Sequence, residues 1–195
     1  MSTLIARDPD FEARIRDSFR RQGLNETIGA SLALVAPGAV DITVPFASGV
    51  SQQHGFFHGG VIGAIGDNAC GYAAMTLTEA GAEVLTIEYK VNFLSPATGQ
   101  SLVARGRVTK AGRTVTVCAG NVFAVSGGTE KLVATMLVTM MTVPAASAAM
   151  SWAADDAAVR PAQPLSAPAR SGDRPRWCFC RGDRRRTLRT LLSRS

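Results

Sequence analysis

The chain has 195 residues, of which 46% are hydrophobic, and a formal net charge of +6. This length allows one domain of ordinary size, or a smaller domain followed by a tail. No run of about 20 apolar residues without charge is present, and the N-terminal segment alternates charged with apolar residues, so neither a transmembrane helix nor a secretory signal is expected. We therefore expect a cytoplasmic protein that does not bind membranes.

The positive charge is confined to the C-terminal part of the sequence. Residues 1–144 contain eleven Lys or Arg and eleven Asp or Glu, whereas residues 145–195 contain ten Arg and four Asp. The neutral first part gives no indication of nucleic-acid binding, and the basic part has few aromatic residues among its arginines. We predict a domain over 1–144, followed by an Ala/Pro/Arg-rich tail over 145–195 that is either disordered or a reading-frame artefact.

The first half of the domain predicts two helices that flank a pair of short strands. Residues 10–22 have apolar side chains four apart and predict an amphipathic helix. Two short strands, 31–35 and 40–44, flank a Pro-Gly turn. A proline-free segment rich in Ala, Ile and Gly then predicts one long helix from Gly59 to about Glu79, ended by Gly81.

Four β-rich runs follow this long helix, at 84–94, 101–110, 114–125 and 131–143. Runs of around ten residues exceed the usual five or six and are typical of a strongly curved sheet. Because neither a single helix nor a four-strand meander buries its apolar face alone, the two must pack together. The pattern therefore predicts an α+β domain.

The long helix carries two stripes of different character. One stripe is apolar and is expected to face the sheet: Ile62, Ile65, Ala69, Tyr72 and Thr76. The other consists of small residues around a single carboxylate: Gly60, Ala64, Asp67, Gly71 and Ala74. Asp67 is the only charged residue between Gly59 and Leu77. A solvated surface acid is the simpler interpretation, but a carboxylate among small residues is partly desolvated, which is costly unless the group is paired or used.

The start of this helix suits an anion. Glycines at His58-Gly59-Gly60 leave backbone N–H groups uncovered, and the helix dipole adds positive potential, as the oxyanion of a reacting carbonyl requires. A tight entry turn is the alternative. Gly60 and Asp67 are seven residues apart, about 10 Å along the axis, which is too far for both to serve one carbon. Two antiparallel helices across a two-fold axis remove this difficulty and predict a dimer with shared sites.

These motifs together resemble one family. The stretch QxxGxxHGGxxxxxxD, followed by LTIEYKVNFLSPA, GRT and EKLVATMLVTMMT, is similar to the PaaI-like branch of the hotdog thioesterases over roughly residues 20–143. The resemblance implies the hotdog fold, a curved antiparallel sheet wrapped around one long central helix. It also implies hydrolysis of acyl-CoA without metal or cofactor, by a homodimer or a dimer of dimers.

The resemblance also implies roles for individual residues. Asp67 is the nucleophile or general base, Gly60 supplies an oxyanion N–H, and His58 contacts or orients the thioester. Gln52 stands where relatives often have Asn, and the Thr86 hydroxyl assists the attacking water. Further substrate or CoA contacts are expected from Gly59, Asn68, Lys90, Asn92, Lys110 and Arg113, although a solvated surface position is the simpler interpretation of each Lys or Arg.

Three other functions deserve comparison. A hotdog dehydratase or hydratase is disfavoured because its Pro-containing histidine motif is missing, no proline lying between Pro45 and Pro96. A non-catalytic acyl-CoA-binding protein would not require the acid at position 67. Nucleic-acid binding would depend on the basic tail alone.

Overall fold

The computed structural model describes residues 4–145, so the tail predicted over 145–195 lies outside the described residues except for Ala145. The helices are α1 (Phe11–Arg21), α2 (Gly23–Thr27), the short 3-10 helix η1 (Ser48–Val50) and α3 (Gly59–Met75). The strands are β1 (Ser31–Ala36), β2 (Ala39–Pro45), β3 (Glu83–Phe93), β4 (Ser101–Lys110), β5 (Val115–Ser126) and β6 (Thr129–Val143). Among residues 4–145, no helix combines the length and apolar character needed to cross a membrane.

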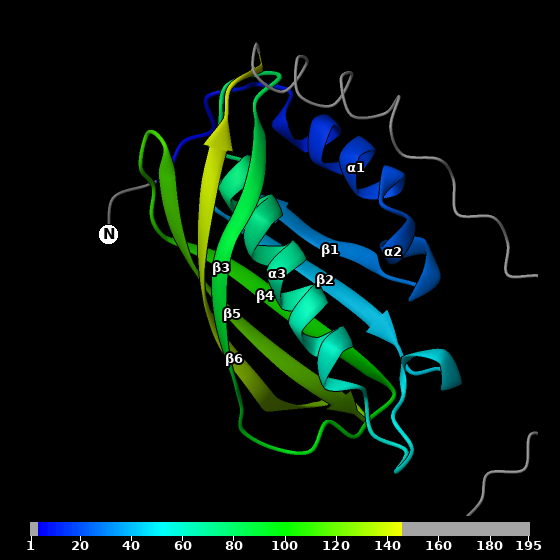
Figure 1. The fold of residues 1–195 in the computed structure, drawn as a ribbon. Helices are drawn as coiled ribbons and strands as arrows, with labels where there is room; N and C mark the ends of the chain where they lie inside the picture. The colour runs from blue at the N-terminus through cyan, green and yellow to red at the C-terminus, as the bar shows by residue number, and fades with distance from the viewer. Residues whose placement is uncertain (1–3, 146–195) are drawn as a thin grey trace, which may run out of the picture. The chain divides into compact units, whose positions relative to one another are not determined.

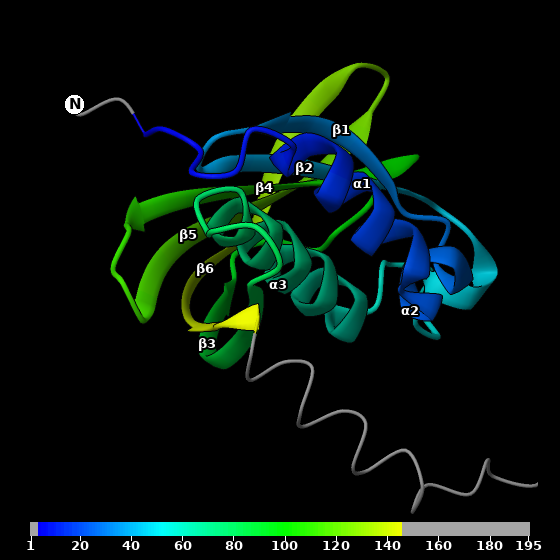
Figure 2. The same ribbon diagram turned by 90° about the horizontal axis from the view of Figure 1, so that it is seen from above.

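The six strands form one antiparallel sheet that curves around α3 (Figures 1 and 2). The strand order is β1-β2-β4-β5-β6-β3, so β1 and β3 are the edge strands. α3 packs against β2, β3, β4, β5 and β6, and α1 lies beside β1 and α3. The predicted α+β hotdog architecture is confirmed. Between residues 4 and 145, only the short helices α2 and η1 have no counterpart in the sequence-based prediction.

The core forms where α3 meets the inner face of the sheet. Every residue of the predicted apolar stripe is buried, Ile65 and Ala69 completely. Gly106 explains how β4 comes so close to the helix, because a Cβ at this position would lie 2.2 Å from the Ala69 carbonyl oxygen. Only glycine allows this approach of strand to helix.

α3 ends earlier than predicted. The last helical residue is Met75 rather than Glu79, and Gly81, with φ of +75°, belongs to the following turn. Two threonines account for the difference by bonding to backbone carbonyls: Thr76 Oγ1 donates to Ala73 O at 2.7 Å and Thr78 Oγ1 to Met75 O at 2.9 Å. Such local bonds compete with continuation of the helix.

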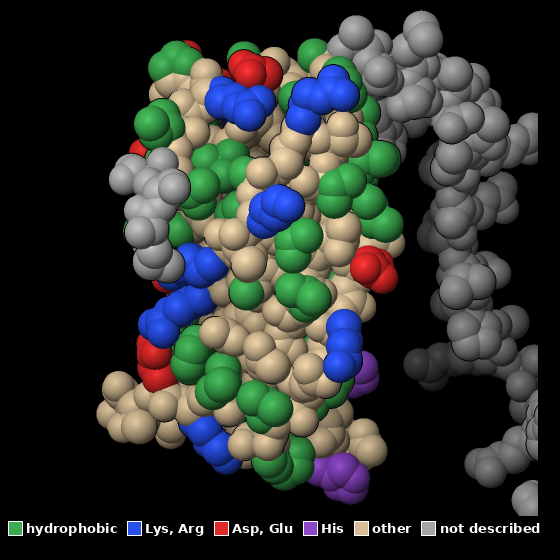
Figure 3. Space-filling view, turned by 90° about the vertical axis from the view of Figure 1, so that its left-hand side faces the viewer, with side chains coloured by type: hydrophobic (Ala, Val, Ile, Leu, Met, Phe, Trp, Pro, Cys, Tyr) green, Lys and Arg blue, Asp and Glu red, His purple; other side chains and the backbone are tan. Residues whose placement is uncertain are grey.

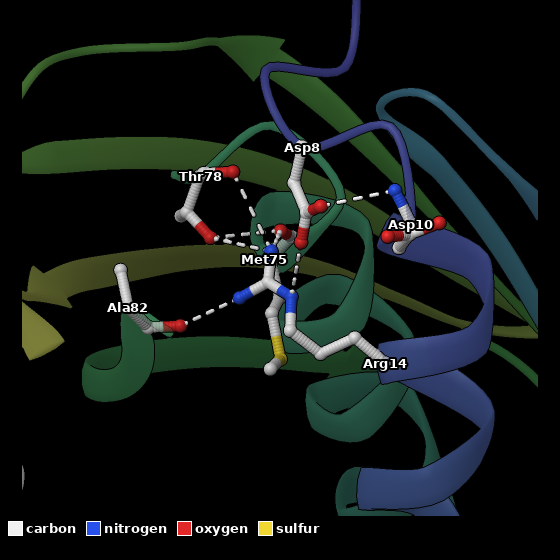
Figure 4. A network of polar contacts seen from close by, with 6 residues as sticks. All are labelled: Asp8, Asp10, Arg14, Met75, Thr78 and Ala82. Atoms are coloured by element: carbon white, nitrogen blue, oxygen red, sulfur yellow. Dashed lines mark hydrogen bonds and ion pairs between the residues drawn. The ribbon is translucent and has the colours of Figure 1, made fainter. Parts of the chain in front are cut away.

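Arg14 of α1 fastens the end of α3 (Figure 4). Its guanidinium donates to Met75 O at 3.2 Å and to Ala82 O at 2.7 Å, and also bonds to Thr78. Its Nε lies 3.0 Å from Asp8 Oδ2, and the Asp8 side chain is only 6% exposed. The carbonyls at a helix C-terminus have no intrahelical donor, so this partly buried arginine supplies one while Asp8 balances its charge.

The outer face of the sheet differs from the inner face. Charged and hydrophobic side chains are interspersed on it (Figure 3). Arg105 there contacts Asp41 and Glu130, and its guanidinium lies 4.7 Å from the centre of the Phe123 ring.

Candidate active site between α3 and β3

A narrow strip of contacts joins α3 to the edge strand β3. It is defined by three pairs, namely Gly59 with Phe93, Gly63 with Tyr89, and Asp67 with Thr86. The helical partners are four residues apart and so lie on one face of α3. We call this set of six residues the α3–β3 strip.

A β-bulge determines which β3 side chains face the helix. The pairing of β3 with β6 shifts register between Thr86 and Glu88, so Ile87 is an extra residue. This extra residue reverses the alternation of side chains. Thr86 on one side of the bulge and Tyr89 and Phe93 on the other therefore all face α3. Simple alternation from Thr86 would have placed Tyr89 and Phe93 on the outer face, so sequence analysis missed both as site residues.

Asp67 lies in the middle of α3 and is partly buried. Desolvation by burial raises the pKa of its carboxyl above the ordinary value, and a hydrogen bond from Thr86 partly offsets this rise. The Thr86 hydroxyl donates to Asp67 Oδ1 at 2.9 Å. Within residues 4–145 no Lys or Arg forms an ion pair with Asp67. The structure therefore brings two of the predicted site residues together around a carboxylate that holds a proton more readily than usual.

The glycine turn begins α3 as predicted. His58 is the N-cap, and its Nδ1 accepts a hydrogen bond from the Gly60 N–H at 2.9 Å. The N–H predicted to hold an oxyanion thus already has a side-chain partner. The Gly59 N–H has no hydrogen-bond acceptor within the described part of the chain. A Cβ at Gly59 would lie 3.3 Å from the Phe93 ring, so this aromatic ring packs beside the start of the helix.

Gln52 lies in the loop that leads to this turn. Its Oε1 accepts from the His54 backbone N–H at 2.5 Å, and Gly55, with φ of +79°, allows the loop to fold back. The loop closes through a hydrogen bond from the Gln52 N–H to the Phe56 carbonyl. Gln52 is therefore held by its own loop in this structure, and its contact with water or substrate stays a prediction.

The remaining predicted contact residues are spread over the domain. Lys90 and Asn92 are exposed and alternate with the inward Tyr89 and Phe93, which places them on the outer face of the sheet. Asn68 is directed to α2, where its Nδ2 donates to Asn25 Oδ1 at 2.9 Å. The structure does not group these three with Asp67, and it gives Asn68 a role in joining α3 to α2.

Lys110 is the last residue of β4, and Arg113 lies in the turn that leads to β5. Arg113 lines a cavity of about 510 Å³. Ala74 and Leu77 also line it, and Arg7 and Glu79, which form an ion pair, contribute charge. This cavity begins two helical turns beyond Asp67 and is large enough for part of a small molecule.

Cys70 and Cys118 are free thiols that are fully buried in the core. A hydrogen bond with Cys118 and burial raise the pKa of the Cys70 thiol, which disfavours its use as a nucleophile beside Asp67. In the described range, no three His, Cys, Asp or Glu side chains lie together in a way that would hold a metal ion.

Comparison with known proteins identifies the same region. The model of the family described as the thioesterase superfamily matches residues 54–131, which include the glycine turn, Asp67 and Thr86. A curated protein of Saccharolobus solfataricus described as an esterase is 34% identical over 80 residues. That match covers 41% of this chain and 56% of the relative, so the chain matches only about half the length of this curated protein.

Solved structures extend the similarity to most of the described residues. A thioesterase family protein from Silicibacter pomeroyi is 44% identical, with 68% of this chain and 98% of that chain covered and a TM-score of 0.67. The E. coli PaaI protein from the phenylacetic acid degradation operon shares the fold with a TM-score of 0.62 at 18% identity, over 69% of this chain and 94% of that chain.

Proposed function

This chain belongs to the thioesterase superfamily, and from that premise we propose that it hydrolyses acyl-CoA thioesters to a carboxylic acid and CoA. The observation that carries the proposal is the partly buried carboxylate of Asp67. It lies on α3, the helix that begins at the glycine turn, and it accepts a hydrogen bond from Thr86 of β3. A raised pKa suits a group that must take up and release a proton near neutral pH.

The chemistry follows from these groups. As general base, Asp67 takes a proton from water while the water oxygen forms a bond to the thioester carbon. The carbonyl oxygen becomes an oxyanion stabilised by backbone N–H groups at the start of α3. Collapse of this intermediate breaks the C–S bond, and the leaving thiolate takes the proton from Asp67. As nucleophile, the Asp67 carboxylate would instead attack the thioester carbon, so that the C–S bond breaks, CoA leaves as a thiolate and a mixed anhydride forms. Water then cleaves the anhydride, which restores the Asp67 carboxylate and releases the carboxylic acid, and the thiolate takes up the proton that the water loses.

The oxyanion donors are the Gly60 N–H and its neighbour in the same turn. Gly60 becomes available when the exposed His58 ring turns away from it, and Gly59 has no competing acceptor within residues 4–145. His58 would then be free to contact the thioester, in line with its predicted role. The proposed contacts for CoA phosphates are Arg113, which lines the cavity at the other end of α3, and Lys110, three residues before it in the chain.

We further propose that the active unit is a homodimer with shared sites. β3 is an edge strand whose exposed apolar residues suit burial against a second copy: Leu85, Ile87, Tyr89 and Phe93. An edge strand with such side chains is a template for pairing. Antiparallel pairing across a two-fold axis would set Gly60 of one chain opposite Asp67 of the other.

Hydrolysis is tested with a panel of acyl-CoA esters and detection of free thiol. Release of thiol together with the free acid supports hydrolysis. A hydratase would consume an unsaturated acyl-CoA without releasing thiol, and a binding protein would show saturable binding without any turnover.

Site sharing is tested by mixing two inactive variants, Asp67→Ala and Gly60→Pro. In a heterodimer one composite site contains both intact halves and the other contains neither. About half of the wild-type sites should therefore regain activity in isolated heterodimers. If verified, folded heterodimers regain none, each chain holds a complete site.

A further inference from the structure

Tyr89 occupies the centre of the α3–β3 strip. Its hydroxyl lies 3.4 Å from the position of a Cβ at Gly63. Gly63 is one helical turn from Gly59 and one turn from Asp67, about 6 Å along the axis in each direction. The aromatic side chain therefore lies between the oxyanion turn and the acid.

The environment of this side chain leaves it available to a ligand. Tyr89 is 47% exposed, although Gly63 beneath it is buried. The described part of the chain offers the Tyr89 hydroxyl no hydrogen bond. Because Gly63 has no side chain, the ring rather than the helix forms the surface at this point.

In the proposed dimer, the position of Tyr89 lies close to the two-fold axis. If Gly60 of one chain faces Asp67 of the other, the two-fold axis passes between the two α3 helices at the level midway between these residues, next to Gly63 and Ala64. Each reacting carbon then lies about 5 Å from the axis, half of the seven-residue interval. The two identical sites therefore lie on opposite sides of the axis, and the Tyr89 side chains of both chains lie between them.

The two arms of the substrate must leave the reacting carbon in different directions. CoA is large and carries charged phosphates, so its arm has to run outward to solvent, toward Lys110 and Arg113. The acyl group must then extend from the reacting carbon toward the two-fold axis. The distance of about 5 Å to the axis accommodates roughly three to four carbon–carbon bonds of about 1.5 Å each. Beyond that length the acyl group meets the Tyr89 ring.

We propose that Tyr89 sets the upper limit on acyl length and makes this protein selective for short acyl-CoA esters. This inference rests on the proposed acyl-CoA hydrolysis and on the shared dimer site, neither of which specifies the length of the acyl group. The bulk of the ring imposes the limit, while the hydroxyl is not needed for it.

The test is kcat/KM for acetyl-, butyryl-, octanoyl- and decanoyl-CoA, measured by free-thiol release. For the wild-type protein we expect decanoyl-CoA to be hydrolysed at least about 10-fold less efficiently than butyryl-CoA. Tyr89→Ala should raise the decanoyl-to-butyryl ratio by about 10-fold or more, since the misfit of a few methylenes costs a factor of this order. Tyr89→Phe should leave the ratio unchanged.

Two controls keep the result interpretable. Leu24→Ala removes an exposed side chain on α2, away from the strip, and should change no ratio. Tyr89→Leu keeps apolar bulk in the dimer surface with a shorter side chain. It should give an intermediate ratio even if Tyr89→Ala fails to assemble.

The outcomes separate the two levels of the argument. A wild-type protein that hydrolyses none of the esters refutes the proposed function, and the inference with it. Hydrolysis of decanoyl-CoA as efficient as that of butyryl-CoA, or Tyr89 variants that change all substrates by one common factor, would leave the proposed function standing and overturn the role of Tyr89.

Discussion

Removing the Thr86 hydroxyl should shift the pH dependence of the reaction. Thr86→Val keeps the shape of the side chain but deletes the donor that lies 2.9 Å from Asp67 Oδ1. This hydrogen bond favours the charged carboxylate, whereas burial disfavours it and is the larger influence. With the donor gone, only burial remains, so the pKa of Asp67 should rise further.

The size of the shift can be bounded from the contact. A hydrogen bond to a charged group contributes about 1.5–3 kcal/mol, and partial exposure of Asp67 reduces this to about 1 kcal/mol. At about 1.4 kcal/mol per pH unit, the acid limb of kcat should move upward by up to about one unit. Asp67 acts as base or nucleophile only when deprotonated, so activity is lost on the low-pH side and the variant loses it earlier.

The assay is the pH profile of thiol release for wild type and Thr86→Val, from about pH 4 to pH 9. Thr139→Val, which removes a hydroxyl on the outer face of the neighbouring strand, is the matched control and should leave the profile unchanged. An unmoved acid limb in a folded Thr86→Val protein would refute the assignment of this limb to Asp67 and its hydrogen bond.

Other predictions concern stability and the extent of the domain. Asp67→Asn should raise the melting temperature at neutral pH. Burial raises the pKa of Asp67 in the folded state, so this carboxyl makes the fold less stable as pH rises from the unfolded-state pKa through the folded-state pKa. Calorimetry at pH 4 and pH 7 checks this. Arg14→Ala should lower the free energy of unfolding in urea by about 3–5 kcal/mol, because it leaves the buried Asp8 without its cationic partner. The control Arg16→Ala removes only an exposed ion pair and should lower it by less than about 1 kcal/mol. Truncation after Pro144 should preserve folding and thiol release, since the strip and the glycine turn lie within 4–144; loss of either would assign the remaining residues to the fold.

The strands and the central helix were predictable from sequence because their signals are local. The four long strands have continuous β-rich runs bounded by turn residues, and their observed ends lie within about two residues of those predicted. The end of α3 was not predictable from sequence. Threonine can continue a helix, but Thr76 and Thr78 help to end this one because their hydroxyls donate to the backbone carbonyls of the last turn. The contact of Arg14 with the end of α3 depends on tertiary packing that the sequence does not display.

The site was predictable only in part for a similar reason. Asp67 stood out as the sole charge in an apolar helix, and the glycine turn stood out by composition. The placement of Tyr89 and Phe93 depends on a single bulged residue, Ile87, which alternation cannot reveal. Whether His58 bonds to the Gly60 N–H depends on a side-chain rotation, and this too has no signature in the sequence.

The central claim is that Asp67 performs the chemistry of thioester hydrolysis, and the most direct test is thiol release by Asp67→Asn. This change keeps the size of the side chain and can still accept a hydrogen bond from Thr86, but removes the group that bonds to a proton or to the acyl carbon. We predict a fall in kcat of about 10²-fold or more in a protein that remains folded. Near-normal turnover by Asp67→Asn on the same acyl-CoA would contradict the account.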